Sequence, residues 1–208
     1  MSKDFIATII ATCDRPDLLK NRSLPSVLHQ TNCPDLVLVV DDSAPVNKSR
    51  NRDIVTALRF PQDRVLYLEN TRTKGAAGAW NTAIRHLYRQ GFYECWVALL
   101  DDDDEWQPQY LENCLANSMA EDADIVVSGL IRRTETTPNH AQSISRQGFT
   151  RADFYVGNPH WQGSNTFIRL SALIAAGGFD ESFTSTNDRD LGIRLLDLGF
   201  LKWAFVHD

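Results

Sequence analysis

Short apolar segments alternate with segments of helical periodicity through the first half of the chain. The predicted strands are Phe5–Thr12, Leu36–Val40, Arg64–Glu69 and Cys95–Leu100, and the predicted helices are Arg15–Gln30, Lys48–Leu58, Ala76–Arg89 and Pro108–Met119. Strands and helices that alternate in this way form βαβ units around a parallel sheet. We therefore predict an α/β fold in which a Rossmann-like, mostly parallel central sheet is flanked by helices on both faces.

The second half of the chain is less regular. Its predicted strands are Ala123–Ile131, Ser164–Leu170 and Leu201–His207, and its predicted helices are Ser171–Ala176 and Asp188–Leu198. The polar segment Arg132–Gly148 has no periodicity, and we expect a long loop or an exposed hairpin there, a kind of segment that is often functional. With 208 residues the chain is long enough for one large core, so we predict a single domain over residues 1–208.

Four aspartates and a glutamate, Asp101–Glu105, follow directly on a predicted core strand. Two like charges about 4 Å apart repel by ~1 kcal/mol in water and by more where water is scarce. Acidic runs are usually solvated loops, but this one is anchored to the core. If the chain stays extended, Asp101 and Asp103 point to the same side and could share Mg²⁺ or Mn²⁺. A cation that is held for an anionic substrate would balance the charge.

A second predicted strand also ends in acids, at Asp41 and Asp42. Ligands of open parallel sheets bind beyond the carboxyl ends of the strands, so both acidic strand ends are candidate site residues. The two aspartates could equally cap the strand or start a turn.

Other acidic and glycine-rich motifs fit this sequence less well. A calcium loop that begins at Asp101 would need glycine where Trp106 stands, and an aspartyl phosphatase would need threonine at Glu105. The stretch "TKGAAGAW" matches neither GxGxxG nor GxxxxGK[ST], and no GxSxG is present. A site for a cation and a nucleotide remains the best interpretation.

Composition limits the partners and the compartment. The chain has 21 basic and 27 acidic residues, which gives a net charge of −6, so a general nucleic-acid surface is not expected. The four cysteines show no CxxC spacing, which favours free thiols and a reducing, cytoplasmic compartment. The apolar stretches are too short for a signal peptide or a membrane span, although peripheral contact with a membrane stays open.

Six segments together resemble the family 2 glycosyltransferases, which have the GT-A fold. They are "TIIATCDRPDLL", "LVVDDSAP", "ENTRTKGAAGAWNTAI", "ALLDDDDEWQPQYLE", "GSNTFIRLSALIAAGGFDESF" and "NDRDLGIRLLDLG", and their order and spacing are specific to that family. The resemblance implies a metal-dependent, inverting transferase that uses Mn²⁺ or Mg²⁺. Its donor would be a nucleoside diphosphate sugar of UDP or GDP type, and its acceptor the hydroxyl of a glycan or another molecule.

The resemblance also implies roles for particular residues. Asp188 matches the catalytic base, and Asp101 and Asp103 match the D-x-D motif that binds the metal, with His207 as a further ligand. The implied nucleotide-sugar contacts are Thr12, Asp14, Arg15, Asp41 or Asp42, Arg72, Lys74, Asn81, Asp101 and Asp102. On the acceptor side we expect His160 and Trp161, because aromatic faces suit sugar rings, or else these two residues pack in the core or at its rim.

The sequence departs from the family pattern in three ways. The acid that normally precedes the base is Asn187, and "GAWN" replaces the commoner Ala-Arg-Asn. Relatives often continue beyond this length, so the chain is either a bare catalytic domain or a truncated one.

Asp188 itself has a simpler alternative as a helix cap, and Trp106 is expected to pack beneath the acidic segment. Two other functions stay open, a sugar nucleotidyltransferase and a non-catalytic nucleotide-sugar binding domain.

Overall fold

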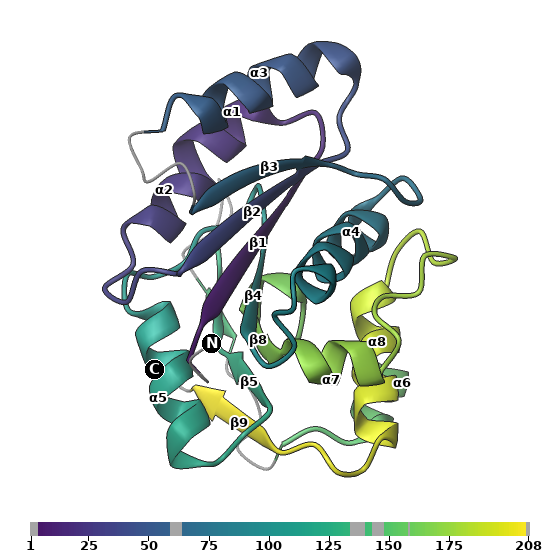
Figure 1. The fold of residues 1–208 in the computed structure, drawn as a ribbon. Helices are drawn as coiled ribbons and strands as arrows, with labels where there is room; N and C mark the ends of the chain where they lie inside the picture. The colour runs from purple at the N-terminus through teal and green to yellow at the C-terminus, as the bar shows by residue number, and fades with distance from the viewer. Residues whose placement is uncertain (1–3, 59–63, 134–139, 143–147, 158, 207–208) are drawn as a thin grey trace.

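A seven-stranded sheet lies between two layers of helices in the computed structural model, which describes residues 4–58, 64–133, 140–142, 148–157 and 159–206 (Figure 1). The strands are β1 (Ile6–Thr12), β2 (Leu36–Asp41), β3 (Val65–Glu69), β4 (Trp96–Asp101), β5 (Ile125–Ser128), β8 (Thr166–Arg169) and β9 (Trp203–Val206). Their order across the sheet is β3-β2-β1-β4-β8-β5-β9. All pairs are parallel except those of β8, which runs antiparallel to β4 and β5. The predicted fold class is confirmed.

Helices cover both faces of the sheet. They are α1 (Pro16–Leu18), η1 (Leu19–Ser23), α2 (Leu24–Leu28), α3 (Pro45–Thr56), α4 (Ala76–Arg89), α5 (Tyr110–Ala120), α6 (Arg151–Val156), η2 (Gly163–Asn165), α7 (Leu170–Ala175) and α8 (Asn187–Asp197). Helices α1–α3 and α5 pack on one face, and α4, α6, α7 and α8 pack on the other (Figure 1). Because β1, β2 and β4 have apolar residues on both sides, each face has its own hydrophobic core.

The first helical segment contains one wider turn. The π-helical turn η1 directly precedes α2, which has Pro25 in its first turn. Proline has no N–H to donate, and its ring clashes with the carbonyl four residues earlier in a regular α-helix. A π-helical turn at this place removes that conflict without ending the helical segment.

Two parts of the second half differ from a simple βα pattern. Strands β6 (Leu130–Arg132) and β7 (His140–Gln142) pair antiparallel as a separate two-stranded sheet, so the described part of the Arg132–Gly148 segment adopts the hairpin alternative. Helix α6 was not predicted. Its start carries a capping box, in which the side chains of Thr150 and Asp153 each accept a hydrogen bond from the other residue's backbone N–H. The sequence does contain this signal.

Candidate active site

A cleft of ≈ 1840 Å³ lies beyond the carboxyl end of β4. One wall is the acidic turn that follows β4, a second is η2 with the β6–β7 hairpin, and a third is the start of α8. The acidic residues that line it are Asp101, Asp103, Asp104, Glu105 and Asp188. The sheet topology thus brings two parts of the sequence that are far apart to one cleft.

The acidic turn rests on Ser164 of η2. The backbone N–H of Asp101 donates to the Ser164 hydroxyl oxygen at 3.1 Å, and the backbone N–H of Asp104 donates to the Asp101 carbonyl at 3.2 Å. The Trp106 indole N–H donates to the Ser164 carbonyl at 2.7 Å, and its ring stacks on Tyr110 at 4.4 Å. Trp106 therefore packs beneath the turn as predicted, whereas sequence reasoning missed Ser164, an unremarkable serine that only the fold brings here.

The Asp102 side chain points away from the cleft. Its carboxylate is fully buried and accepts hydrogen bonds from the Thr12 hydroxyl at 2.7 Å and the Cys13 N–H at 3.3 Å. The Arg15 guanidinium adds an ion pair at 2.6 Å. Asp102 thus fastens the loop after β1 to the end of β4, and its enclosed carboxylate is engaged by the protein itself. The buried hydroxyl of Thr12 is engaged in the same contact.

Two arginines supply part of the positive charge that the acidic run requires. Arg15 Nη1 lies 2.5 Å from the Asp103 carboxylate, and Arg22 Nη1 donates to the Asp103 carbonyl at 2.7 Å. We expected Arg15 to contact a nucleotide, but the structure pairs it with Asp102 and Asp103. Sequence reasoning missed Arg22, because only the helical segment after β1 brings it to the turn.

These arginines do not fully neutralise the turn. Burial, together with the negative charges of Asp104, Asp103 and Asp102, raises the pKa of Asp101 to about 7. The four aspartates Asp101–Asp104 outnumber the two arginines that contact them, which leaves an excess of negative charge. The open side of the turn is therefore suited to a cation.

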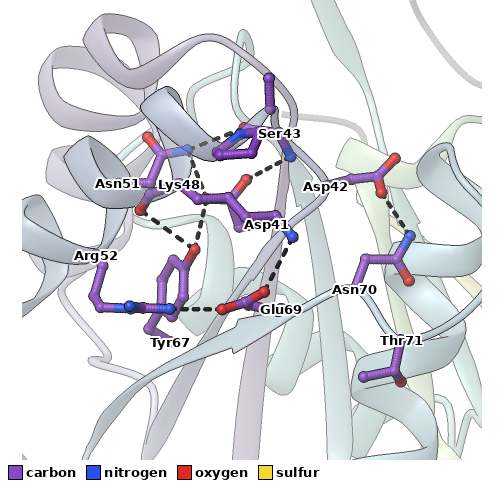
Figure 2. Close-up of polar contacts among 12 residues, drawn as sticks. Asp41, Asp42, Ser43, Lys48, Asn51, Arg52, Tyr67, Glu69, Asn70 and Thr71 are labelled. Atoms are coloured by element: carbon purple, nitrogen blue, oxygen red, sulfur yellow. Dashed lines mark hydrogen bonds and ion pairs between the residues drawn. The ribbon is translucent and has the colours of Figure 1, made fainter.

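The two aspartates at the end of β2 have different environments (Figure 2). Asp41 is fully buried and accepts hydrogen bonds from the Ser43 N–H at 2.8 Å, the Asn51 amide at 2.9 Å and the Tyr67 hydroxyl at 2.8 Å. Its carboxylate is satisfied by hydrogen bonds from the protein. Of the two alternatives, Asp41 is the structural residue.

Asp42 and Asp14 hold neighbouring loops together. Asp42 accepts from the Asn70 amide at 2.9 Å (Figure 2). It also accepts from the Gly75 N–H at 2.7 Å, and the two hydrogen bonds fix the loop over residues 70–75. Asp14, in the left-handed region at φ 57°, accepts from the Ala44 N–H at 2.8 Å. Both aspartates are less enclosed than Asp41, and they border the side of the sheet where we expect the nucleotide.

Of the predicted nucleotide contacts in the 70–75 loop and α4, Lys74 has no ion-pair partner among the described residues, whereas Arg72 and Asn81 are bound to other parts of the protein. Lys74 is exposed and forms no ion pair with any residue that the structure describes. Arg72 is paired through Nε with the Glu181 carboxylate. The Asn81 amide is buried and exchanges hydrogen bonds with the Phe179 backbone at 2.8 and 2.9 Å, so it clamps the segment after α7 to α4. Sequence reasoning missed Glu181, although the family motif "GGFDE" contains it.

Asp188 lies in the first turn of α8 and lines the cleft. Its carboxylate accepts from the Arg189 N–H at 2.8 Å, and burial raises its pKa above the ordinary aspartate value despite that hydrogen bond. The N-cap is Thr186, at φ 62°, so the simpler reading of Asp188 as the cap residue is wrong. The predicted i,i+4 pair between Asp190 and Arg194 is present at 2.6 Å.

The expected aromatic acceptor wall is not formed by Trp161. Its side chain is 1% exposed and packs edge-to-face against Phe154 at 5.7 Å and Trp203 at 6.1 Å, so the core alternative is correct. His160 is exposed but does not line the cleft, where Gln162–Asn165 form the wall instead. His207 lies outside the described residues.

The fold and the cleft together define a class of protein. A mostly parallel sheet with one antiparallel strand, an acidic turn after the fourth strand and a carboxylate at the start of a late helix is the arrangement of a GT-A glycosyltransferase domain. The family model "Glycosyl transferase family 2" matches residues 8–175. The chain belongs to this family.

Relatives and solved structures agree with this assignment. The chain is 28% identical over 160 residues to succinoglycan biosynthesis protein ExoA of Rhizobium meliloti, a match that covers 73% of this chain and 47% of that protein. It is 35% identical over 109 residues to the Escherichia coli UDP-Glc:alpha-D-GlcNAc-diphosphoundecaprenol beta-1,3-glucosyltransferase WfgD, which covers 52% of this chain and 39% of that protein. The chain therefore spans about half the length, or less, of these relatives.

Two solved structures share the fold at low sequence identity. Staphylococcus aureus TarS 1-349 in complex with UDP-GlcNAc has a TM-score of 0.73 at 16% identity, over 98% of this chain and 56% of that one. The mannosyltransferase PcManGT from Pyrobaculum calidifontis, in complex with GDP-Man and Mn²⁺, has a TM-score of 0.67 at 20% identity, over 98% of this chain and 55% of that one. Among the described residues, no helix is both long and apolar enough to span a membrane.

Proposed function

We propose that this chain transfers a sugar from a nucleoside diphosphate sugar to an acceptor hydroxyl, with a divalent cation as cofactor and inversion at the anomeric carbon. The observation that carries the proposal is that the acidic turn and the Asp188 carboxylate line the same cleft. The two groups suit the two partners of one displacement reaction. A cation at the acidic turn would balance the negative charge of the leaving diphosphate, and the Asp188 carboxylate would take the proton that the attacking hydroxyl must lose.

The residues of the acidic turn fit a divalent cation. Asp101 and Asp103 would hold it, because they offer hard oxygen ligands and the four aspartates of the turn outnumber Arg15 and Arg22. No three His, Cys, Asp or Glu side chains converge within the described part of the chain. Such a cluster is not required, since Mg²⁺ is often bound by one or two carboxylates together with substrate phosphates and water. When bound, the cation would stabilise the charge of the leaving diphosphate.

Asp188 is the proposed general base. A base works best when its pKa lies near the working pH, and burial moves the pKa of Asp188 in that direction. Its carboxylate pairs with no cationic side chain among the described residues, so it is free to accept a proton from the acceptor hydroxyl. A single displacement that is assisted by one base inverts the anomeric carbon. Asn187, beside it, takes no part in this proton transfer.

The donor and the acceptor follow from the surroundings of the cleft. The relatives above include a glucosyltransferase named for UDP-Glc, and the two solved structures hold UDP-GlcNAc and GDP-Man, which supports a donor of UDP or GDP type. Arg132 and Gln142 of the β6–β7 hairpin and the polar residues of η2 line the same cleft as the acidic turn, so a hydroxyl-rich acceptor such as a glycan suits that side. The four cysteines are free thiols, which supports a reducing, cytoplasmic compartment.

The proposal is tested by incubating the protein with a panel of UDP- and GDP-sugars, with Mn²⁺ and with EDTA. We expect cation-dependent release of the nucleoside diphosphate, and Asp103→Asn should reduce it, whereas Asp197→Asn, in an exposed ion pair with Arg151, should not. Release of pyrophosphate would instead indicate a nucleotidyltransferase. Nucleotide binding without turnover of any sugar would indicate a binding domain.

A further inference from the structure

The Glu181 carboxylate joins two segments that border the proposed donor site. Oε1 accepts hydrogen bonds from Arg72 Nε and from the Asn81 amide, the latter at 2.7 Å, and Oε2 accepts from the Thr73 N–H at 3.2 Å. Burial alone would raise the pKa of Glu181, but these hydrogen bonds outweigh burial and lower it to about 2. The side chain is only 15% exposed and stays ionised at any physiological pH.

This contact orients Arg72 rather than hiding it. The carboxylate occupies the Nε edge of the guanidinium, and the two terminal Nη groups have no hydrogen-bond partner among the described residues. A guanidinium that is held at one edge can still offer its Nη groups to a phosphate in a fixed direction. The Arg72 side chain is 36% exposed, so a ligand can reach it.

The loop that carries Arg72 is closely fixed to the domain. Asp42 holds the Gly75 N–H at 2.7 Å, and Glu181 holds the Thr73 N–H. The loop also lies directly on α4, because a Cβ at Gly78 would be 1.8 Å from the Thr73 carbonyl oxygen. Arg72 therefore has little freedom to find a phosphate unless the loop already presents it.

The other side of Glu181 leads to the helix of the proposed base. The neighbouring Phe179 backbone is clamped by Asn81 of α4, and the Gly178 carbonyl accepts from Arg194 at 2.8 Å. Arg194 belongs to α8 and is also paired with Asp190, two residues after Asp188. Glu181 thus lies where the 70–75 loop meets the segment that anchors α8.

We propose that Glu181 is a positioning residue for the donor, which fixes the Arg72 guanidinium so that its Nη groups meet the diphosphate of the nucleotide. This inference rests on the proposed function. It has a clear competitor, namely that Glu181 only neutralises Arg72. The two alternatives predict opposite effects of removing Glu181 on nucleotide affinity. A residue that merely sequesters Arg72 would weaken nucleotide binding, so its removal would strengthen binding.

A double-mutant cycle on nucleotide affinity tests the assignment. The dissociation constants of UDP and GDP are measured by calorimetry with Mn²⁺ for wild type, Arg72→Ala, Glu181→Gln and the double variant. We expect each single substitution to weaken binding of the preferred nucleotide about tenfold, and the double variant to bind no more weakly than Arg72→Ala, since the two residues act as one unit. Asp197→Asn is the control, because it removes a carboxylate charge from an ion pair at the other end of α8.

Unchanged or tighter binding by Glu181→Gln would overturn the assignment, as would effects that multiply in the double variant. If Glu181→Gln does not fold, Arg72→Lys tests the same geometry, because it keeps the charge but loses Nε and the planar group. Its affinity should fall to that of Arg72→Ala, and wild-type affinity would overturn the proposal. A wild-type protein that binds no nucleotide would refute the proposed function itself, whereas failure of Glu181 alone leaves wild-type binding intact.

Discussion

Carboxylates of the same residue type have opposite roles around this cleft because their burial and partners differ. Asp41 and Asp102 are fully buried and accept hydrogen bonds from the protein, so they hold loops in place. Asp101, Asp103 and Asp188 line the cleft, and burial raises the pKa of both Asp101 and Asp188. A carboxylate whose hydrogen bonds are supplied by the protein holds the structure together, whereas one that lines the cleft remains accessible to a ligand.

The role of Asp188 gives a prediction at the residue scale. Asp188→Asn keeps the shape of the side chain but cannot take a proton, so we expect kcat to fall about 10²- to 10⁴-fold, the usual range for acid–base catalysis. The dissociation constant of the nucleotide should stay unchanged. Because the pKa of Asp188 is raised, wild-type kcat/KM should decline as the pH falls through a value above that of an ordinary aspartate.

Steady-state rates and a pH profile check this prediction. The residual activity of the variant should lack the acidic decline, because no base remains to be protonated. Asn187→Glu, which restores the family acid, should alter the rate only modestly. If Asp188→Asn turns over at the wild-type rate, the base is another residue.

At the scale of elements, α8 packs close to the core because Gly192 has no side chain. A Cβ at Gly192 would lie 2.3 Å from the Trp161 ring and 2.6 Å from the Phe154 ring. These two rings belong to α6 and to the segment after it, so one small residue sets how near α8 and Asp188 come to the sheet. The buried Trp161 thus has a structural role, which explains why it is absent from the cleft.

Gly192→Ala should therefore destabilise the protein. Inserting one methyl group into a well-packed core typically costs about 1–3 kcal/mol, and 1 kcal/mol shifts the melting temperature of a domain of this size by about 2–4 °C. Differential scanning calorimetry measures the change. Gly129→Ala is the matched control, since its Cβ would meet only the Gln142 carbonyl oxygen at 3.6 Å and Tm should hardly change. Equal melting temperatures for the two variants would contradict the prediction.

At the scale of the whole molecule, the sheet separates two hydrophobic cores and joins the two sides of the cleft. One core packs α1–α3 and α5 together with η1, which carries Arg22, and the other packs α4 and α6–α8, the last of which carries Asp188. A ligand that contacts both sides stabilises the folded state as a unit, because binding to the native state alone shifts the unfolding equilibrium.

We accordingly expect nucleoside diphosphate and Mn²⁺ together to raise Tm. A ligand at one hundred times its dissociation constant adds about 2.7 kcal/mol, which corresponds to about 5–10 °C for a chain of this size. Thermal-shift measurements with UDP and GDP test this expectation, with inorganic phosphate as the ligand control. EDTA should abolish most of the shift, and so should Asp103→Asn. A shift of equal size in EDTA would contradict a cation held by Asp101 and Asp103.

Some features of the fold and site were predictable because they depend on local sequence. Helix α4 has the predicted bounds, Ala76–Arg89, because its apolar residues follow one helical face, and Trp106 packs beneath the acidic turn as expected. Helix α6 is short and was missed, and Asn81 and Trp161 were placed in the site although they are buried. Their residue types suit a ligand as well as they suit the core, and only packing distinguishes the two.

The sequence by itself determined the α/β class, the family and the acidic strand ends, because hydrophobic periodicity and motif spacing are properties of the chain order. Only the tertiary structure decided which of the adjacent aspartates is buried, that Arg22 and Ser164 contact the acidic turn, and that Glu181 contacts Arg72 and Asn81. The physical reason is that burial and hydrogen bonding are set by residues far away in the chain. Asp102 meets Thr12 across 90 positions and Glu181 meets Asn81 across 100, and no local pattern records contacts of that range.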